Sequence, residues 1–248
     1  MNLRTFIQKL IQKPLGTYGL AAEMRSIASL ISQSNNLDNI ALRISREQSA
    51  SYVLQNLSKA KSFQSIDEIL DFSLNCVPQE LRDGLFLEFG VWKGRSINRI
   101  AENTTQTIYG FDSFEGLPEF WRNGFEEGEF SLQNNEFPGV LKNVNLVKGW
   151  FDQTLPKFVQ EKTGNIAFLH VDCDLYSSTQ TIFEHLGDRL TVGSIILFDE
   201  YFGYPSWQSH EYLAFKEFIA KSGMLYEYLG YNALHEQVVV RICELPQK

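Results

Sequence analysis

The sequence predicts a doubly wound α/β fold, in which helices cover both faces of a mostly parallel, seven-stranded sheet that follows an N-terminal helical extension. Three observations lead to this prediction. Beyond residue 84, short and almost continuously apolar segments recur between turn residues. Segments of helical length separate several of them, which is typical of parallel strands buried on both faces. The first 80 residues lack this alternation and have mainly helical patterns.

The helical patterns of the first part predict an N-terminal extension over residues 1–80. Residues 45–61 contain neither glycine nor proline. Ser65 and Glu68 have the spacing of a capping box, and apolar residues follow them, which predicts the start of a helix. Pro78 is expected to end that helix. Such an extension could form the contacts of a homo-oligomer.

The alternating part predicts one α/β domain over residues 81–248. The expected parallel strands span residues 85–89, 107–111, 144–147, 166–171 and 194–198. The expected helices span residues 96–102, 155–162, 178–190 and 212–221. Two more strands, at 225–229 and 237–242, have little between them, so we expect an antiparallel pair at one edge of the sheet.

The connection over residues 113–143 is unusually long for a compact domain. It is rich in glycine and acidic residues and contains six aromatic residues. Connections of this length usually carry a function. We therefore expect a lid or a substrate-binding wall here, and a surface insertion with short helices of its own is the alternative.

The composition is that of a folded protein. Of 248 residues, 44% are hydrophobic and 21% are charged, which allows a substantial core and does not fit a disordered chain. The three cysteines show no CxxC spacing, so we expect neither a disulfide scaffold nor a zinc–thiolate site. No apolar run approaches the roughly 20 residues that cross a bilayer. The amphipathic N-terminal segment lacks the features of a signal peptide, and we expect a cytoplasmic protein without a membrane partner.

The net charge of −8 is concentrated in the second part of the chain. Residues 81–248 hold 14 Lys and Arg against 23 Asp and Glu, whereas residues 1–80 are nearly balanced. An acidic body repels phosphate backbones, so a nucleic-acid partner is not expected.

The ends of the first two expected strands indicate a nucleoside site. Gly90 and Gly94 allow a tight turn after the first strand, although they could also be packing glycines. Glu88 stands where a GxGxxG motif has its first glycine, and an acid there would repel a pyrophosphate but attract an ammonium or hydroxyl group. Asp112 ends the second strand, at the place where an acid holds a ribose diol in such sheets; a helix or turn cap is its alternative role. Together these residues indicate a nucleoside-containing ligand without a pyrophosphate.

Carboxylates follow the fourth and fifth expected strands. Asp172 and Asp174 end the fourth strand, and Asp199 and Glu200 end the fifth. Because these strands should be neighbours, the acids should converge, which is unfavourable unless a cation compensates their charge. Oxygen ligands of this kind suit Mg²⁺. The alternative is that Asp174 caps a helix and that one of the last two acids pairs with a basic side chain.

Four segments together resemble the macrocin-type O-methyltransferases, in matching order over roughly residues 80–220. They are LEFGVWKGRS at 87–96, GFDSFEGLP at 110–118, HVDCDLYSST at 170–179 and FDEY at 198–201. The resemblance implies a Rossmann-like class I methyltransferase that uses S-adenosylmethionine and Mg²⁺. It further implies a small, hydroxylated, sugar-containing acceptor from secondary metabolism or a polysaccharide. The first 80 residues carry no matching motif.

The resemblance implies roles at a donor site. The expected donor-binding residues are Glu88, Gly90, Ser96, Asp112, Ser113, Trp150 and Phe151. Glu88 would lie near the ammonium group of the donor, and Asp112 would accept hydrogen bonds from both ribose hydroxyls. Trp150 would offer an aromatic face to the adenine, and packing in the core is its alternative role.

The acids would carry the chemistry. We expect Asp172, Asp199 and Glu200 to bind the metal ion and Asp172 to act as the base as well, with Asp174 as the alternative to Asp172. His210 is a second candidate for the base, although a lone histidine is more often structural. His170 lies inside an expected strand, and we expect it to be a core residue.

Two other functions fit a sheet of this kind. An NAD-dependent Rossmann oxidoreductase is disfavoured by the missing GxGxxG motif and by the carboxylate cluster. A non-catalytic nucleotide-binding domain has no structural need for three clustered acids.

Overall fold

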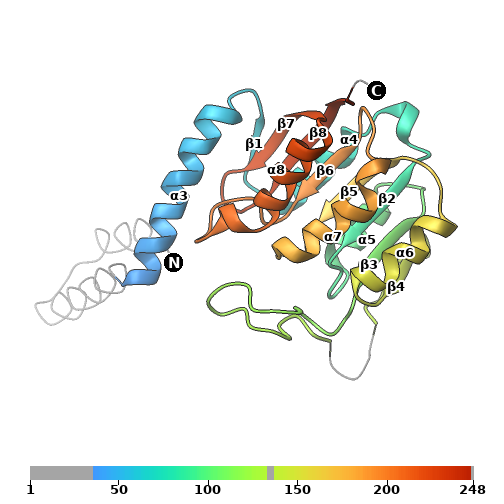
Figure 1. The fold of residues 1–248 in the computed structure, drawn as a ribbon, viewed down its shortest axis with the longest axis horizontal. Coiled ribbons are helices and arrows are strands. Elements are labelled where there is room, and N and C mark those ends of the chain that lie inside the picture. Colours follow the sequence, from blue (N-terminus) through green and yellow to red (C-terminus); the bar gives the residue numbers. More distant parts are fainter. Residues whose placement is uncertain (1–35, 133–136, 247–248) are drawn as a thin grey trace, which may run out of the picture. The chain divides into compact units, whose positions relative to one another are not determined.

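The computed structural model describes residues 36–132 and 137–246. The chain divides into two compact units between Ile44 and Ser45. The described residues of the first unit form the beginning of helix α3 (Leu37–Asn56), which continues into the second unit. The second unit holds the sheet, its covering helices and every residue discussed below (Figure 1).

The sheet has the strand order β1-β7-β8-β6-β5-β2-β3-β4 (Figure 1). The strands are β1 (Lys61–Phe63), β2 (Leu85–Phe89), β3 (Ile108–Asp112), β4 (Val144–Lys148), β5 (Ile166–Val171), β6 (Ile195–Phe198), β7 (Leu225–Asn232) and β8 (Val238–Glu244). β8 is antiparallel to both of its neighbours, and the other pairs are parallel. This arrangement confirms the predicted α/β class with a mostly parallel sheet.

In the described part of the chain the sheet has eight strands rather than the predicted seven. The additional strand, β1, pairs in parallel with β7 and occupies the edge expected for the antiparallel pair. β1 has three residues, of which only Phe63 is buried. Because so short a strand shows neither alternation nor a continuous apolar run, its sequence could not reveal it.

Helices cover the sheet on both faces. They are α4 (Ile66–Asn75), α5 (Arg95–Glu102), α6 (Phe151–Glu161), α7 (Tyr176–Leu186) and α8 (Glu211–Ser222). Residues of α4 and α5 pack in one core cluster, and residues of α6, α7 and α8 pack in the other. Alternate residues of β2 enter the two clusters, for example Phe86 and Leu87, so both faces of the strand are buried.

Helix α4 belongs to the unit that contains the sheet. Its predicted cap is present, since the Ser65 side chain accepts a hydrogen bond from the backbone N–H of Glu68. Ile69 and Leu70 are buried in the core, and the helix ends at Asn75, before the predicted end at Pro78. Residues 45–80, assigned to the extension from the sequence, thus lie in the sheet unit because α4 buries its apolar face there. Residues 1–35 lie outside the described part.

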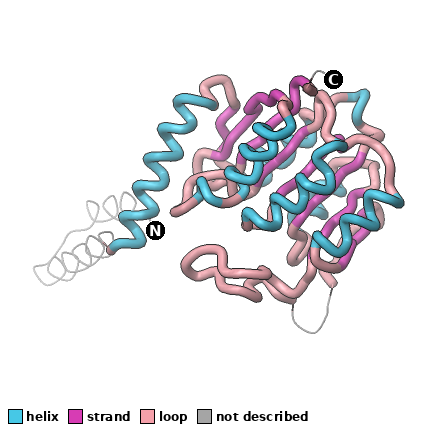
Figure 2. Tube along the Cα trace, viewed as in Figure 1, coloured by secondary structure: helices cyan, strands magenta, loops and turns pink. Residues whose placement is uncertain are grey.

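The long connection between β3 and β4 contains only turns, bends and one isolated bridge in its described residues, 113–132 and 137–143 (Figure 2). Short helices of its own, the alternative expectation, are therefore absent from these residues. Phe114, Leu117 and Trp121 are buried and attach this loop to the core. The described part of the chain contains no helix that is both long and apolar enough to span a bilayer.

Candidate active site

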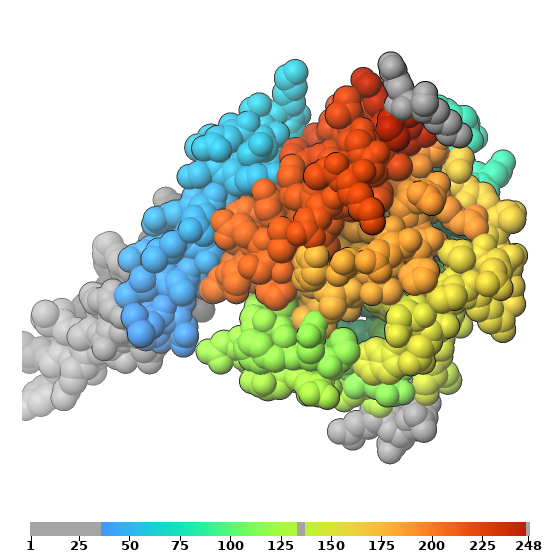
Figure 3. Space-filling view, in the orientation of Figure 1, coloured from blue at the N-terminus to red at the C-terminus, as the bar shows by residue number. Residues whose placement is uncertain are grey.

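A cavity of about 1060 Å³ lies where the parallel strands end. Most of the residues singled out from the sequence line it: Gly90, Ser96, Asp112, Ser113, Trp150, Phe151, Asp172, Asp174, Asp199 and Glu200. The loop over 113–132 contributes a further wall that includes Leu117 and Arg122. In the space-filling view this green loop lies beside the orange α7 segment, and Ser177 of α7 donates a hydrogen bond to Glu119 of the loop (Figure 3).

The turn after β2 brings two strand ends very close together. Gly90 has a φ of +90°, and a Cβ atom at this position would lie 1.6 Å from the carbonyl oxygen of Asp172. The backbone N–H of Asp172 also donates to the carbonyl of Phe89 at 2.9 Å. Only glycine combines this backbone conformation with so close an approach. Gly90 therefore places the turn after β2 directly against the first acid after β5.

Asp112 supports the same turn. Its Oδ2 accepts hydrogen bonds from the backbone N–H groups of Val91 and Trp92, each at 2.8 Å, and its Oδ1 accepts one from Phe114 at 2.6 Å. A carboxylate has about four acceptor positions, so one is left for a ligand. Binding both hydroxyls of a ribose therefore requires one of these backbone contacts to be shared or released.

Glu88 is fully buried and does not line the cavity. Its Oε1 accepts a hydrogen bond from the Ser96 hydroxyl at 2.9 Å, and its Oε2 lies 3.3 Å from Nδ1 of His170. Burial raises the pKa of Glu88, and its contacts with these two side chains only partly offset that effect. We expected Glu88 to contact a ligand directly. In the structure, its neighbours Ser96 and His170 line the cavity instead, and Glu88 lies behind them.

The acids after β5 and β6 converge as predicted, because the two strands are neighbours with Val171 opposite Phe198. Among the described residues, one group of potential metal ligands has donor atoms within 4.8 Å of one another, and it consists of His170, Asp172 and Asp199. Glu200 lines the cavity but is not part of this group, and its buried Oε2 has no hydrogen-bond partner.

Burial and mutual repulsion act on the pKa values of these acids. Burial and the nearby Asp199 raise the pKa of Asp172 and that of Glu200 well above the usual range. Burial raises the pKa of Asp174 to about 7, although Arg122 partly offsets this. Burial first, and then the neighbouring carboxylates, thus disfavour the ionised forms of Asp172 and Glu200.

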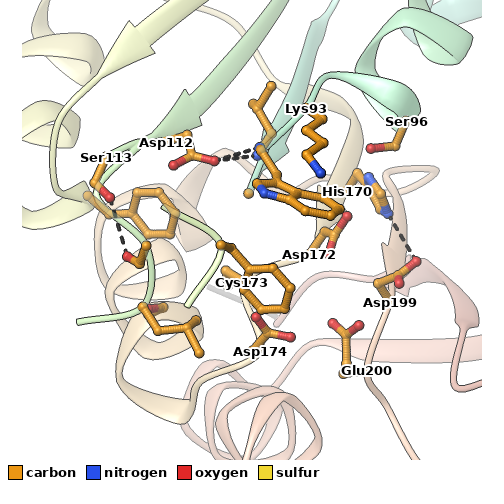
Figure 4. Close-up of a pocket in the computed structure, with 18 of the residues that line it drawn as sticks. Lys93, Ser96, Asp112, Ser113, His170, Asp172, Cys173, Asp174, Asp199 and Glu200 are labelled. Atoms are coloured by element: carbon orange, nitrogen blue, oxygen red, sulfur yellow. Dashed lines mark hydrogen bonds and ion pairs between the residues drawn. The ribbon is translucent and has the colours of Figure 1, made fainter. Parts of the chain in front are cut away.

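His170 was expected to be a core residue, and it is buried, but it also lines the cavity. Its ring lies between Glu88 and Asp199. Nε2 lies 3.6 Å from Oδ1 of Asp199, a contact that Figure 4 marks with a dashed line. Burial alone would lower the pKa of His170, but the two carboxylates outweigh it and raise that pKa well above its usual value. His170 in turn brings the pKa of Asp199 below its usual value, against the effect of burial.

Glu211 was not among the predicted site residues, yet its side chain links the segment after β5 to the segment after β6. It lies fully buried in the first turn of α8. Its two carboxylate oxygens accept hydrogen bonds from the backbone N–H groups of Cys173, at 3.4 Å, and Glu200, at 3.2 Å. Burial raises the pKa of Glu211 well above its usual value.

Two basic residues of the cavity wall were also missed. The Arg122 guanidinium lies 3.8 Å from the centre of the Trp121 ring and pairs with Glu236 at 3.3 Å. Lys93, in the turn after β2, has its ammonium group 4.1 Å from the centre of the Trp92 ring (Figure 4). Only their place in the wall of the cavity, which appears in the folded chain, distinguishes them from surface charges.

His210 precedes α8 and does not line the cavity. Its ring lies beside those of Trp121 and Tyr204, at centroid distances of 6.4 and 6.1 Å. Burial and the charge of Arg122 lower its pKa. His210 thus lies among aromatic rings and outside the residues that line the cavity.

The model of the macrocin O-methyltransferase (TylF) family matches residues 64–223. The chain belongs to this family.

Individual relatives agree with this assignment. The chain is 31% identical over 159 residues to 8-demethyl-8-(2,3-dimethoxy-alpha-L-rhamnosyl)-tetracenomycin-C 4'-O-methyltransferase of Streptomyces olivaceus, covering 53% of this chain and 59% of the relative. It is 30% identical over 155 residues to mycinamicin III 3''-O-methyltransferase of Micromonospora griseorubida, covering 51% and 60%. The matches thus span less than two thirds of the relatives' length.

A solved structure supports the fold. The structure of the O-methyltransferase NovP superimposes with a TM-score of 0.55 at 22% identity, covering 72% of this chain and 79% of that one. This similarity shows that the α/β architecture is shared.

The close approach at Gly90 generates a first prediction. Gly90→Ala should destabilise the protein by roughly 4 kcal/mol or more, because the new Cβ would collide with the backbone of Asp172. Gly139→Ala is the matched control, since its Cβ would meet no atom within 4 Å, and we expect a change within about 0.5 kcal/mol. Urea unfolding of both variants checks this, and equal stabilities would contradict the described turn.

Proposed function

We propose that this protein is an S-adenosylmethionine-dependent O-methyltransferase that acts on a hydroxyl group of a sugar-containing small molecule. One observation carries the proposal: the turn held by Asp112 and the acids after β5 and β6 face the same cavity. This one cavity would therefore hold a nucleoside donor at the turn and, close to it, an acceptor bound beside a cation. Membership of the macrocin O-methyltransferase family supports this choice. The name of one relative includes a rhamnosyl group, which supports a sugar-containing acceptor.

The donor would lie along the turn after β2 and the ends of β3 and β4. We propose that Asp112 and Ser113 bind the ribose and that the adenine lies beside Trp150 and Phe151. All four residues line the cavity. Ser96 would bind the methionine end, with Glu88 fixing the orientation of its hydroxyl group.

The acids fit a divalent cation. Glu200 has a buried carboxylate oxygen without a partner, and Asp172 and Asp199 have oxygens within 4.8 Å of each other. A cation would favour the ionised forms of Asp172 and Glu200, whose pKa values are raised by burial and by the nearby Asp199. We propose that Asp172, Asp199 and Glu200 hold Mg²⁺, which when bound would act as a Lewis acid on the acceptor hydroxyl.

The protein's own residues would position the acceptor and remove its proton. Methyl transfer needs the acceptor oxygen in line with the S–CH₃ bond of the donor, so orientation contributes much of the rate. Asp174 is buried, lines the cavity and lies outside the group of ligand atoms around Asp172. Since Asp172 would be engaged with the cation, we assign the role of base to Asp174, which was the alternative expected from the sequence. Its raised pKa is suited to accepting a proton near neutral pH.

A ligand comparison separates this proposal from an NAD-dependent enzyme. At about 100 times its Kd, S-adenosylhomocysteine should stabilise the protein by about 2.7 kcal/mol and raise the Tm by several degrees, whereas NADH should have no effect. Asp112→Ala should abolish the shift, and the exposed control Asp188→Ala should retain it. Stabilisation by NADH alone would contradict the proposal.

A second comparison separates the cation site from the donor site. Asp199→Asn should abolish the heat of Mg²⁺ binding in calorimetry, because one of the ionised ligands is lost. In the absence of added cation, the same variant should bind S-adenosylhomocysteine within about threefold of the unaltered protein, since Asp199 lies outside the donor site. Unchanged Mg²⁺ binding in Asp199→Asn would refute the proposed ligand set.

A further inference from the structure

A continuous line of polar side chains runs inside the protein from the proposed donor site to the proposed cation site. The Ser96 hydroxyl donates to Oε1 of Glu88 at 2.9 Å, and Oε2 of Glu88 lies 3.3 Å from Nδ1 of His170. Nε2 of His170 lies 3.6 Å from Oδ1 of Asp199 (Figure 4). We call these four residues the relay.

The sheet itself brings the relay together. Glu88 on β2 stands directly opposite His170 on β5 in the parallel register. β6 lies on the other side of β5, and Asp199 follows its last residue. The backbone N–H of Asp199 donates to the carbonyl of Val171 at 2.9 Å, which fixes the start of this segment against β5. Three adjacent strands therefore position Glu88, His170 and the start of the segment that carries Asp199, while Ser96 lies in α5.

The two central residues of the relay are buried. Glu88 is 0% exposed and His170 is 2% exposed. Glu88 does not line the cavity, whereas Ser96, His170 and Asp199 do. The contact between the two ends of the relay thus runs through the wall of the cavity and does not depend on a ligand that bridges them.

We propose that His170 is a positioning residue that couples the donor site to the cation site. The inference rests on the proposed function, from which it takes the two sites. A donor that binds Ser96 restricts the Glu88 carboxylate, which restricts the His170 ring and, through it, the Asp199 carboxylate. A cation then binds an already oriented ligand and loses less free energy in ordering it, so each ligand strengthens binding of the other.

The imidazole ring is suited to this role because its two nitrogens contact two different carboxylates at once. An amide side chain can replace only one of these contacts. Asparagine at position 170 would place its amide near the position of Nδ1, towards Glu88. Glutamine would place its amide near the position of Nε2, towards Asp199. Both variants keep a polar group in the site but interrupt the relay at opposite ends.

Calorimetry on the full chain tests the coupling. S-adenosylhomocysteine is titrated with and without saturating Mn²⁺. The unaltered protein should bind it at least about fivefold more tightly with Mn²⁺, within the usual range of coupling between sites. In His170→Asn and in His170→Gln this ratio should fall below about twofold, and Mn²⁺ affinity should fall about tenfold or more. The matched control His185→Gln, in the last turn of α7, should retain the ratio of the unaltered protein.

Substitutions of the buried His170 can unfold the protein, so a variant at the donor end of the relay provides an independent test. Ser96→Ala removes the hydroxyl group that contacts Glu88 at a half-buried position of α5, and we expect it to fold with a Tm close to that of the unaltered protein. It should also lower the coupling ratio, although Ser96 does not contact the acids after β5 and β6. A purely structural role of His170 would leave the ratio in Ser96→Ala unchanged.

The outcomes distinguish the relay from the proposed function. An unaltered protein that binds neither S-adenosylhomocysteine nor Mn²⁺ would overturn both. An unaltered protein that binds both ligands without coupling, or folded variants that retain the full ratio, would overturn the relay alone. Electron spin-echo spectroscopy of bound Mn²⁺ adds a direct check. An imidazole nitrogen coupled to the ion, and lost in His170→Asn, would make His170 a ligand and refute its role as a positioning residue.

Discussion

The site depends on how the fold keeps a group of carboxylates together beyond the ends of β5 and β6. Asp174 and Glu211 are buried, whereas Asp172, Asp199 and Glu200 are partly exposed and line the cavity. Burial and mutual repulsion disfavour their ionised forms, so nearby donors or positive charge must compensate. The fold supplies part of this compensation through His170, through Arg122 and through the backbone N–H groups that Glu211 binds. The proposed cation would supply the rest.

The same strand ends also bring the donor turn to the acids. Because Gly90 has no side chain, the turn after β2 rests directly on the backbone of Asp172. Asp112 holds that turn through two backbone N–H groups, so the residue proposed to bind the ribose also shapes its surroundings. The loop after β3 closes the other side, where Arg122 pairs with Glu236 beside a cluster of aromatic rings. The two proposed sites therefore lie at the ends of the same three neighbouring strands, β2, β5 and β6.

Local patterns in the sequence predicted the α/β class and the acids at the strand ends, because in parallel sheets the residues that follow the strands gather at one edge. The spacing of Ser65 and Glu68 also predicted the N-terminal cap of α4. β1 was not predicted because its three residues carry no periodic pattern. His170 was assigned to the core because a residue inside a strand gives no sign of its partners. Its partnership with Glu88 depends on the pairing of β2 with β5, which are some 80 residues apart in the chain.

We propose that these acids hold a divalent cation beside the donor turn, and the proposed function depends on that ion. A crystal structure with Mn²⁺ and S-adenosylhomocysteine, recorded at an energy where manganese scatters anomalously, tests it most directly. We expect one anomalous peak within coordination distance of Asp172, Asp199 and Glu200, with the nucleoside ribose at Asp112. A map without such a peak, with the carboxylates instead paired to Arg122 or Lys93, would contradict it.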